Sequence, residues 1–326
     1  MAARLHGAVR HAGPLARRHA PRPVPGDPRL PAAGSALRQS PRVISRNLLV
    51  RVAFAVPAIA AALLLLRLGG WALAGVLAVL GVLGTREVYD FARVQGIEPL
   101  EWIGFIGAAL CPLATYWVKG YAEWEPVVYV GAVWLLVVLV VAAARGPERR
   151  PLTAVAVTVF GGLYASALLS FIVAIRHGPH SDAHPRGSVA LVVLPLVVTW
   201  ICDTCAMAGG ALVGGPKLAP VLSPRKTWAG AVAGLVGGLL AALAYGALVL
   251  DRVALRLGMW QLVTVGVVGV VAAQVGDVAE SLLKREAGVK DSSSLIPGHG
   301  GVLDRLDSLY FVLPLTAALF RLFGVA

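Results

Sequence analysis

The sequence has few charged residues, and acidic residues are the scarcest of them. Of its 326 residues, 58% are hydrophobic and only 14% are charged. A soluble domain carries about a quarter charged residues, so this composition excludes an ordinary soluble globular protein. The 17 acidic residues are outnumbered by 29 lysines and arginines, which gives a formal net charge of +12. Each acid within an apolar stretch therefore needs an explanation.

Cysteine is also rare, and its three positions lie in apolar sequence: Cys111, Cys202 and Cys205. Cys202 and Cys205 form a C-x-x-C pair, which in other contexts indicates zinc binding or redox chemistry. No second pair is present to complete a zinc site. We therefore interpret the cysteines as small packing residues of helices.

Long apolar blocks fill most of the chain after residue 47. A helix needs about 20 apolar residues to cross a bilayer, and only helices or closed barrels satisfy their backbone polar groups in lipid. Barrel strands alternate in pieces of about 10 residues, whereas these blocks are longer and continuous. The prediction is an all-α, polytopic transmembrane helix bundle of about nine spans. The predicted spans are 48–66, 70–85, 102–117, 126–144, 153–175, 189–208, 229–250, 259–279 and 308–325.

The first 47 residues differ from the rest of the chain. They hold nine arginines, seven prolines and a single acid, Asp27. Such a segment cannot bury a core, so we predict a disordered basic tail over 1–47 and a multi-pass membrane catalytic domain over 48–326, with its motifs in 200–307. A mitochondrial transit peptide is also Arg-rich and poor in acids, but the many prolines argue against the amphipathic helix that it requires.

Basic residues in the loops predict the orientation. With the tail in the cytoplasm, the inside loops hold twelve basic residues and the outside loops six. The positive-inside rule therefore predicts a cytoplasmic N-terminus, in a cell inner (plasma) membrane, and a C-terminus on the other side. The same orientation places the loops 209–227 and 280–307 on the cytoplasmic face as active-site loops.

Two apolar segments carry acids at membrane depth. Asp203 lies within L-V-V-T-W-I-C-D-T-C-A-M, and an intramembrane carboxylate usually faces a partner or a wet cavity. Asp277, Glu280, Ser281 and Lys284 stand at i, i+3, i+4 and i+7, so they share one face of a helix. Such a polar stripe turns inward, away from lipid.

The segment that follows mixes acids, bases and glycines in a loop, K-D-S-S-S-L-I-P-G-H-G-G-V-L-D-R-L-D from Lys290 to Asp307. Carboxylate oxygens suit Mg²⁺, which in turn bridges phosphate oxygens. Glycine backbone amides approach an anion freely. The segment therefore indicates a metal and polyphosphate site.

The other loop contains S-P-R-K-T-W-A-G. Ser223 is a natural helix N-cap and Pro224 a natural first helical residue. We therefore expect Arg225 and Lys226 in the first turn of a helix. A cation at the N-terminal end of a helix is unfavourable for helix stability, unless the helix amides and the cationic side chains bind an anion together.

The 27 residues S-L-L-K-R-E-A-G-V-K-D-S-S-S-L-I-P-G-H-G-G-V-L-D-R-L-D, Ser281 to Asp307, resemble the signature of the phosphatidate cytidylyltransferases, also called CDP-diglyceride synthetases. The S-P-R-K-T-W-x-G loop and Asp203 also resemble family elements. The resemblance implies that the phosphate of phosphatidic acid attacks the α-phosphorus of CTP, which gives CDP-diacylglycerol and pyrophosphate with Mg²⁺. A second, monovalent cation is left open. One departure is Ala229, where the family usually has Glu.

The resemblance also implies residue roles. The metal ligands would be Asp277 and Asp304, with Asp307 and Asp203 as weaker candidates. Catalytic roles fall to Asp277, Asp304, Lys284 and His299. Substrate phosphates would be held by Ser223, Lys226, Thr227, Arg285, Lys290 and Arg305, with Lys284. His299 is either a general base or a residue that orders its loop.

The residues alone point the same way, because in-line phosphoryl chemistry relies on positioning and charge neutralisation and needs no covalent intermediate. Two alternatives remain: a CTP-dependent kinase of a polyprenol or similar lipid, and an ion-coupled transporter with Asp203 and Asp277 as coupling carboxylates. The expected partners are CTP, phosphatidic acid and membrane lipids, and not nucleic acid. The glycine-rich stretch 230–238 permits close helix contact within or between chains, so a homodimer is left open.

Overall fold

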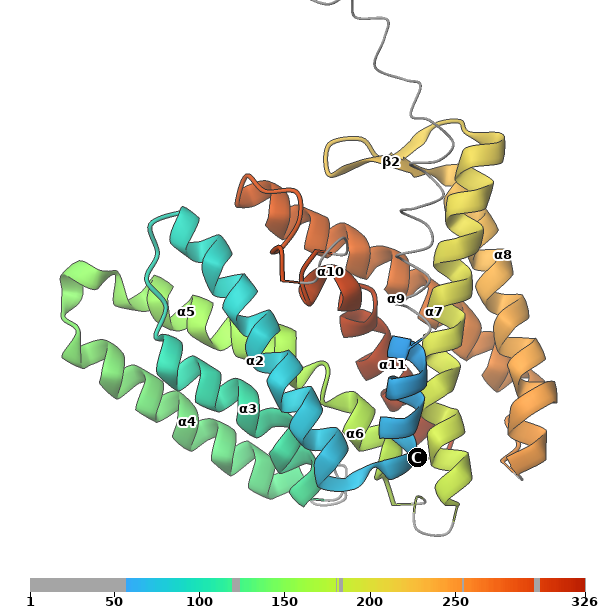
Figure 1. Cartoon of the computed structure of the whole chain (residues 1–326), viewed down its shortest axis with the longest axis horizontal. Coiled ribbons are helices and arrows are strands. Elements are labelled where there is room, and N and C mark those ends of the chain that lie inside the picture. The colour runs from blue at the N-terminus through green and yellow to red at the C-terminus, as the bar shows by residue number, and fades with distance from the viewer. Residues whose placement is uncertain are drawn as a thin grey trace, which may run out of the picture. The chain divides into compact units, whose positions relative to one another are not determined.

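The computed structural model describes residues 57–118, 124–179, 181, 184–253, 255–295 and 300–325. Within these ranges the chain is almost entirely helical (Figure 1). The tail predicted over 1–47 and the candidate residue His299 lie outside the described residues.

The helices differ in length and regularity, and one short hairpin interrupts them. In chain order, the elements are α2 (Gly70–Val94), α3 (Glu101–Trp117), α4 (Trp124–Ala144), η1 (Pro147–Arg149), α5 (Pro151–Gly162), the π-helical turn η2 (Leu163–Ala167), α6 (Phe171–Arg176), α7 (Pro185–Val213), β1 (Lys217–Ala219), β2 (Ser223–Thr227), α8 (Trp228–Tyr245), η3 (Gly246–Leu250), η4 (Asp251–Val253), α9 (Met259–Glu286), α10 (Leu303–Leu306) and α11 (Leu309–Leu322).

Six helices in the described residues are long and apolar enough to cross a membrane. They cover Gly70–Val94, Glu125–Ala144, Pro151–Arg176, Pro185–Val213, Trp228–Val253 and Met259–Glu286. These helices make the chain a multi-pass helical membrane protein, as the apolar blocks predict. The other three predicted spans correspond to shorter helices: Pro57–Leu68, α3 and α11. The structure therefore supports six long spans and leaves the count of nine as a prediction.

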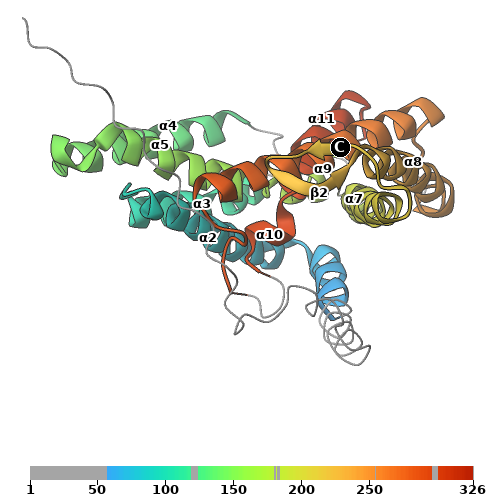
Figure 2. The same ribbon diagram turned by 90° about the horizontal axis from the view of Figure 1, so that it is seen from above.

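The N-terminal and C-terminal helices form neighbouring groups. Figures 1 and 2 show α2, α3, α4 and α5 together at one end, α7 and α8 at the other, and α9 and α11 between them. One main core of buried apolar side chains runs through α2, α6, α7, α9 and α11, with Leu73, Val173, Leu194, Val265 and Leu313 among its members. Helix α9 therefore lies where both groups meet.

Helices α7 and α8 pack closely along their length (Figure 1). Glycines on α8 make this possible, since a Cβ at Gly230 would lie 2.6 Å from the carbonyl oxygen of Ala206. Cys202 is fully buried against the same helix, and its Sγ would lie 3.1 Å from a Cβ at Gly234. The C-x-x-C pair thus packs against glycines, and none of the three cysteines forms a disulfide.

The expectation of a helix starting at Ser223 is wrong. Residues 223–227 form strand β2, which pairs antiparallel with β1, so one short hairpin interrupts a fold that is otherwise helical in the described residues, as predicted. Helix α8 begins only at Trp228, and Thr227 is its N-cap, with Oγ1 accepting from the N–H of Gly230 at 3.1 Å. Serine and threonine are both good caps, and pairing with β1 decides between them. Pro224 is tolerated because each strand of a two-stranded sheet is an edge.

Candidate functional site

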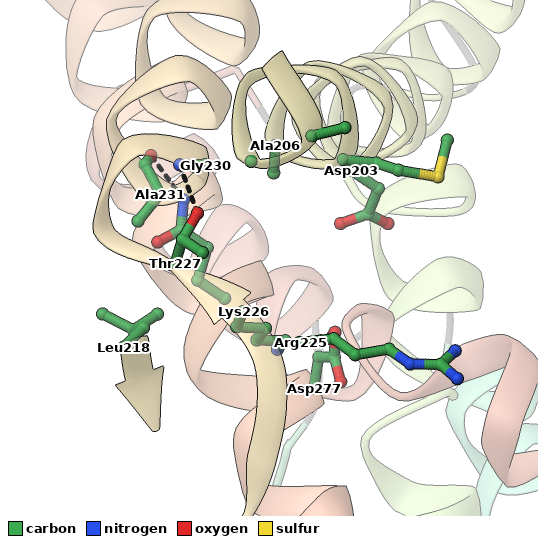
Figure 3. A pocket seen from close by; sticks show the side chains of 13 residues that line it. Asp203, Ala206, Leu218, Arg225, Lys226, Thr227, Gly230, Ala231 and Asp277 are labelled. Atoms are coloured by element: carbon green, nitrogen blue, oxygen red, sulfur yellow. Dashed lines mark hydrogen bonds and ion pairs between the residues drawn. The ribbon is translucent and has the colours of Figure 1, made fainter. Parts of the chain in front are cut away.

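A cavity of about 400 Å³ opens between α7, the β-hairpin, α8 and α9. Its polar lining comes from residues far apart in sequence: Asp203, Arg225, Lys226, Thr227, Gln274 and Asp277. Apolar side chains of α7 and the hairpin, such as Ala206, Met207 and Leu218, complete the wall. Figure 3 shows the Asp203 carboxylate pointing from α7 toward the side where Lys226 and Asp277 lie.

Lys226 and Asp277 form an ion pair inside this cavity. The Nζ of Lys226 lies 2.6 Å from Oδ2 of Asp277, and the two side chains are 22% and 36% exposed. Strand β2 brings Arg225, Lys226 and Thr227 to the cavity, where Lys226 reaches Asp277 and Thr227 also caps α8. An ammonium and a carboxylate that line the same cavity are suited to a ligand that carries both phosphates and a metal ion.

A second polar cluster lies around the C-terminal end of α9. The Nζ of Lys284 donates to Oε2 of Glu280 at 2.8 Å and to Oδ1 of Asp304 at 2.7 Å. The Oδ2 of Asp304 accepts from the N–H of Ser292 at 2.7 Å and from the N–H of Gly301 at 2.9 Å. The predicted polar face of α9 is therefore confirmed. Asp277 lines the cavity, whereas Lys284 contacts Glu280 and Asp304 of the segment that follows the helix.

The carboxyl groups of Asp304 and Asp307 have shifted pKa values of opposite sign. Burial acts to raise the pKa of Asp304, but the N–H of Gly301, Lys284 and the N–H of Ser292 outweigh it and lower this pKa. The pKa of Asp307 is raised, first by burial and then by the negative charge of Asp277. Asp304 is thus held as a carboxylate, whereas the charge of Asp307 is disfavoured.

The remaining predicted phosphate ligands lie outside these two clusters. Arg285 donates to the carbonyl oxygens of Leu222 at 3.4 Å and Val289 at 3.2 Å, which ties α9 to the hairpin. Lys290 and Arg305 are exposed, and within the described ranges neither side chain has a hydrogen-bond or ion-pair partner. Ser223 is half-buried at the start of β2 and does not line the cavity.

Two polar residues of these clusters were missed by the sequence reasoning. Gln274, one turn before Asp277 on α9, lines the cavity and donates to the carbonyl oxygen of Ala231 at 3.0 Å. Glu87, on α2, is 3% exposed and accepts four hydrogen bonds from the loop after α9. The scarcity of acids was a signal for Glu87, because it is an acid on the buried face of an apolar helix.

The carboxylates around the cavity fit Mg²⁺ on chemical grounds. Asp203, Asp277 and Asp307 lie within electrostatic range of one another. In the part of the chain that the structure describes, no three His, Cys, Asp or Glu side chains form a metal site by themselves. Mg²⁺ usually takes one or two carboxylates together with substrate phosphates. The facing carboxylates of α7 and α9 match that donor set, while both oxygens of Asp304 already accept hydrogen bonds.

Together these features define a class: a multi-pass membrane protein of helices, with carboxylates, one ammonium and one guanidinium gathered in one cavity. Comparison with known proteins narrows the class, because residues 49–323 match the model of the Cytidylyltransferase family. The chain belongs to this family.

Three relatives illustrate the likeness. The chain is 31% identical to the "Phosphatidate cytidylyltransferase" of Synechocystis sp. over 287 residues, which covers 81% of this chain and 94% of the relative. It is 42% identical to the protein of the same name from Brucella suis over 163 residues, or 50% of this chain. It is 31% identical to "Phosphatidate cytidylyltransferase 4, chloroplastic" of Arabidopsis thaliana over 265 residues, with 74% of this chain and 66% of the relative covered. The chain spans only 55% of the length of the Brucella suis relative.

Proposed function

We propose that this protein is a phosphatidate cytidylyltransferase, which converts CTP and phosphatidic acid into CDP-diacylglycerol and pyrophosphate. The observation that carries the proposal is the cavity in which Lys226 pairs with Asp277 opposite Asp203. It offers cations for phosphates and carboxylates for a metal ion on the apolar walls of α7 and α8. The relatives' printed name supplies the substrate class.

In the proposed reaction, a phosphate oxygen of phosphatidic acid attacks the α-phosphorus of CTP. A new P–O–P bond forms, and the bond between the α-phosphorus and the bridging oxygen breaks as pyrophosphate leaves. Lys226 and Arg225, on the hairpin, bind and orient the triphosphate through charge-assisted hydrogen bonds. The residues act mainly by positioning and by neutralising charge, so no covalent intermediate on the protein is required.

The proposal includes a Mg²⁺ ion held by Asp277 and Asp203, with Asp307 close by. When bound, Mg²⁺ neutralises phosphate charge and stabilises the leaving pyrophosphate. Lys226 then passes from Asp277 to a phosphate of the substrate. Asp304, which the sequence also predicts as a ligand, reaches a metal only if it exchanges the donors that it now holds. Lys284 keeps Asp304 and Glu280 in place beside the cavity.

Location is part of the same proposal. CTP is a cytoplasmic substrate, so the hairpin and the loop after α9 face the cytoplasm of a cell inner membrane, with the N-terminus on that side. Phosphatidic acid reaches the cavity from the bilayer, along the apolar side chains that α7 exposes, such as Met207 and Leu212.

The test is an assay of the purified full-length chain in mixed micelles with CTP, phosphatidic acid and Mg²⁺. Mass spectrometry should detect CDP-diacylglycerol together with an equal amount of pyrophosphate, and the Asp277→Asn variant should form neither. Release of CDP with a phosphorylated lipid alcohol would show a lipid kinase instead. A folded protein that forms no nucleotide product would overturn the proposal.

A further inference from the structure

The buried carboxylate of Glu87 is satisfied entirely by the loop after α9. Its Oε1 accepts from the Ser293 hydroxyl at 2.7 Å and from the N–H of Val302 at 2.9 Å. Its Oε2 accepts from the Ser292 hydroxyl and from the N–H of Leu303, both at 2.9 Å. A carboxylate offers about four lone-pair sites, so these four contacts occupy it, with the single Ser292 hydroxyl proton shared between Glu87 and Asp304.

No cation shares this burial with Glu87. Among the described residues it forms no ion pair with a lysine, arginine or histidine. A buried charge without a counter-ion is strongly unfavourable unless hydrogen bonds compensate for lost hydration. Glu87 therefore depends on the folded loop, and the loop depends on Glu87 for its backbone donors.

The loop backbone is shaped around this carboxylate. Val302 and Leu303 stand at the start of α10, where N–H groups have no partner within a helix. Just before them, a Cβ at Gly301 would lie 2.5 Å from Oε2 of Glu87, so a side chain at 301 would force the Glu87 carboxylate and the Ser292 hydroxyl to shift. The two ends of the loop, at Ser292 and at Val302, are thus drawn to one side chain of α2.

The same contacts continue into the candidate site. The Ser292 hydroxyl lies 2.9 Å from Oδ2 of Asp304 as well as from Glu87. Asp304 in turn holds Lys284, which holds Glu280. A continuous chain of polar contacts therefore runs from α2 to the polar face of α9. It ends at Lys284 and Glu280, which lie about two turns and one turn after Asp277 on that helix.

We propose that Glu87 is a positioning residue: it holds Ser292, Ser293, Val302 and Leu303 against α2 and thereby sets Asp304 and Lys284 beside the substrate cavity. It does not touch the substrate. This inference rests on the proposed function only in its kinetic test.

The test replaces Glu87 by glutamine, which keeps the volume and exchanges one acceptor oxygen for an NH₂ donor. Whichever way the amide points, that donor faces a backbone N–H, of Val302 or of Leu303. Hydrogen exchange followed by mass spectrometry should show the amides of Val302 and Leu303 exchanging about tenfold faster or more, as expected when one hydrogen bond to a charged group is lost. Peptides from α7 and α8 should be unchanged.

Steady-state kinetics of the same variant separate positioning from substrate binding. The kcat should fall about tenfold or more, while the KM for CTP changes less than about threefold, because the hairpin cations are untouched. Glu148→Gln is the matched control, since it makes the same change at an exposed carboxylate of η1. It should match the wild type in both measurements.

Ser293→Ala is the milder variant if Glu87→Gln does not fold, because it removes one of the four donors. It should speed exchange at Val302 and Leu303, and at Leu295, whose N–H donates to the Ser293 hydroxyl at 3.2 Å. Unchanged exchange in either variant, or a KM for CTP that rises in step with the fall in kcat, would overturn the inference. A wild-type protein that makes no CDP-diacylglycerol would overturn the proposed function and leave the exchange result standing.

Discussion

Lys226 of the hairpin and Asp277 of α9 meet at 2.6 Å across the cavity. Fifty residues of chain, including all of α8, separate the two partners, so the ion pair reports how the hairpin closes on α9. The two partners have different roles in the proposed site, because Lys226 would bind a phosphate and Asp277 would bind the metal ion. The pair therefore keeps both charges satisfied until a ligand offers each a better partner.

Replacing Asp277 by asparagine should abolish turnover. The variant keeps the side-chain volume but removes the charge that the proposed Mg²⁺ requires, and a loss of more than tenfold corresponds to at least about 1.4 kcal/mol of transition-state stabilisation. The measurement is formation of CDP-diacylglycerol by purified, folded protein. Asp251→Asn, at an exposed position of η4, is the matched control. Retention of more than about a tenth of the wild-type rate would show that Asp277 is not a metal ligand.

Replacing Lys226 by methionine should weaken CTP binding. The variant keeps the apolar stem and removes the ammonium, and a lost hydrogen bond between charged groups is worth about 1.5–3 kcal/mol, so the KM for CTP should rise roughly tenfold or more. Lys217→Met, at an exposed position of β1, provides the control on the same hairpin. Equal KM values for the two variants would remove Lys226 from the triphosphate site.

The opposite pKa shifts of Asp304 and Asp307 predict opposite effects on stability. Because the folded state lowers the pKa of Asp304, its charge stabilises the fold above the ordinary carboxyl pKa of about 3.9, and this stabilisation is lost as the pH falls through the lowered value. Because the pKa of Asp307 is raised, its charge opposes folding once the pH rises above that ordinary value. At pH 7, Asp304→Asn should therefore lower the melting temperature in detergent, and Asp307→Asn should leave it equal or raise it. Shifts of the same sign would contradict the assigned environments.

A cysteine introduced at position 148 should report the orientation. Glu148 is exposed in η1, and the positive-inside rule predicts that this turn lies in the cytoplasm. A membrane-impermeant thiol reagent should label Glu148→Cys in inverted vesicles and not in intact cells, with the wild-type cysteines as background. Labelling of intact cells would reverse the topology and move the site to the other face.

Deleting residues 1–40 should leave turnover per folded molecule within tenfold of the wild type. The deleted segment carries no motif, and its arginines suit contact with anionic lipid, so insertion is the property that it would affect. Expression and turnover are measured separately. A larger loss of turnover at normal expression would give the tail a role in the chemistry.

Local pattern was sufficient to predict the polar face of α9. The spacing of Asp277, Glu280 and Lys284 fixes their common side on any helix, and the structure places Glu280 and Lys284 in direct contact. It was insufficient at Ser223, where two good capping residues lie four positions apart. Pairing with β1, a tertiary contact, selects Thr227.

Glu87 shows a different limit. Its sequence neighbours form an ordinary amphipathic helix, and nothing local says that its partners are Ser292, Ser293, Val302 and Leu303. Residues that are distant in sequence are brought together by packing of the core, and a short motif contains no information about that packing. The signature segment resembles a self-contained unit, yet its conformation is completed by a helix near the other end of the protein.

Gly301 and Glu87 depend on each other, because the Glu87 carboxylate lies where a side chain at 301 would be, although more than two hundred residues separate them in sequence. A larger residue at 301 would displace the carboxylate from its present position, and a displaced carboxylate no longer accepts from the N–H groups of Val302 and Leu303. Drift at either position alone is therefore penalised. Among descendants of a common ancestor the two positions should change together or not at all, so the N-terminal helices are inherited as part of the catalytic unit rather than as an interchangeable membrane anchor.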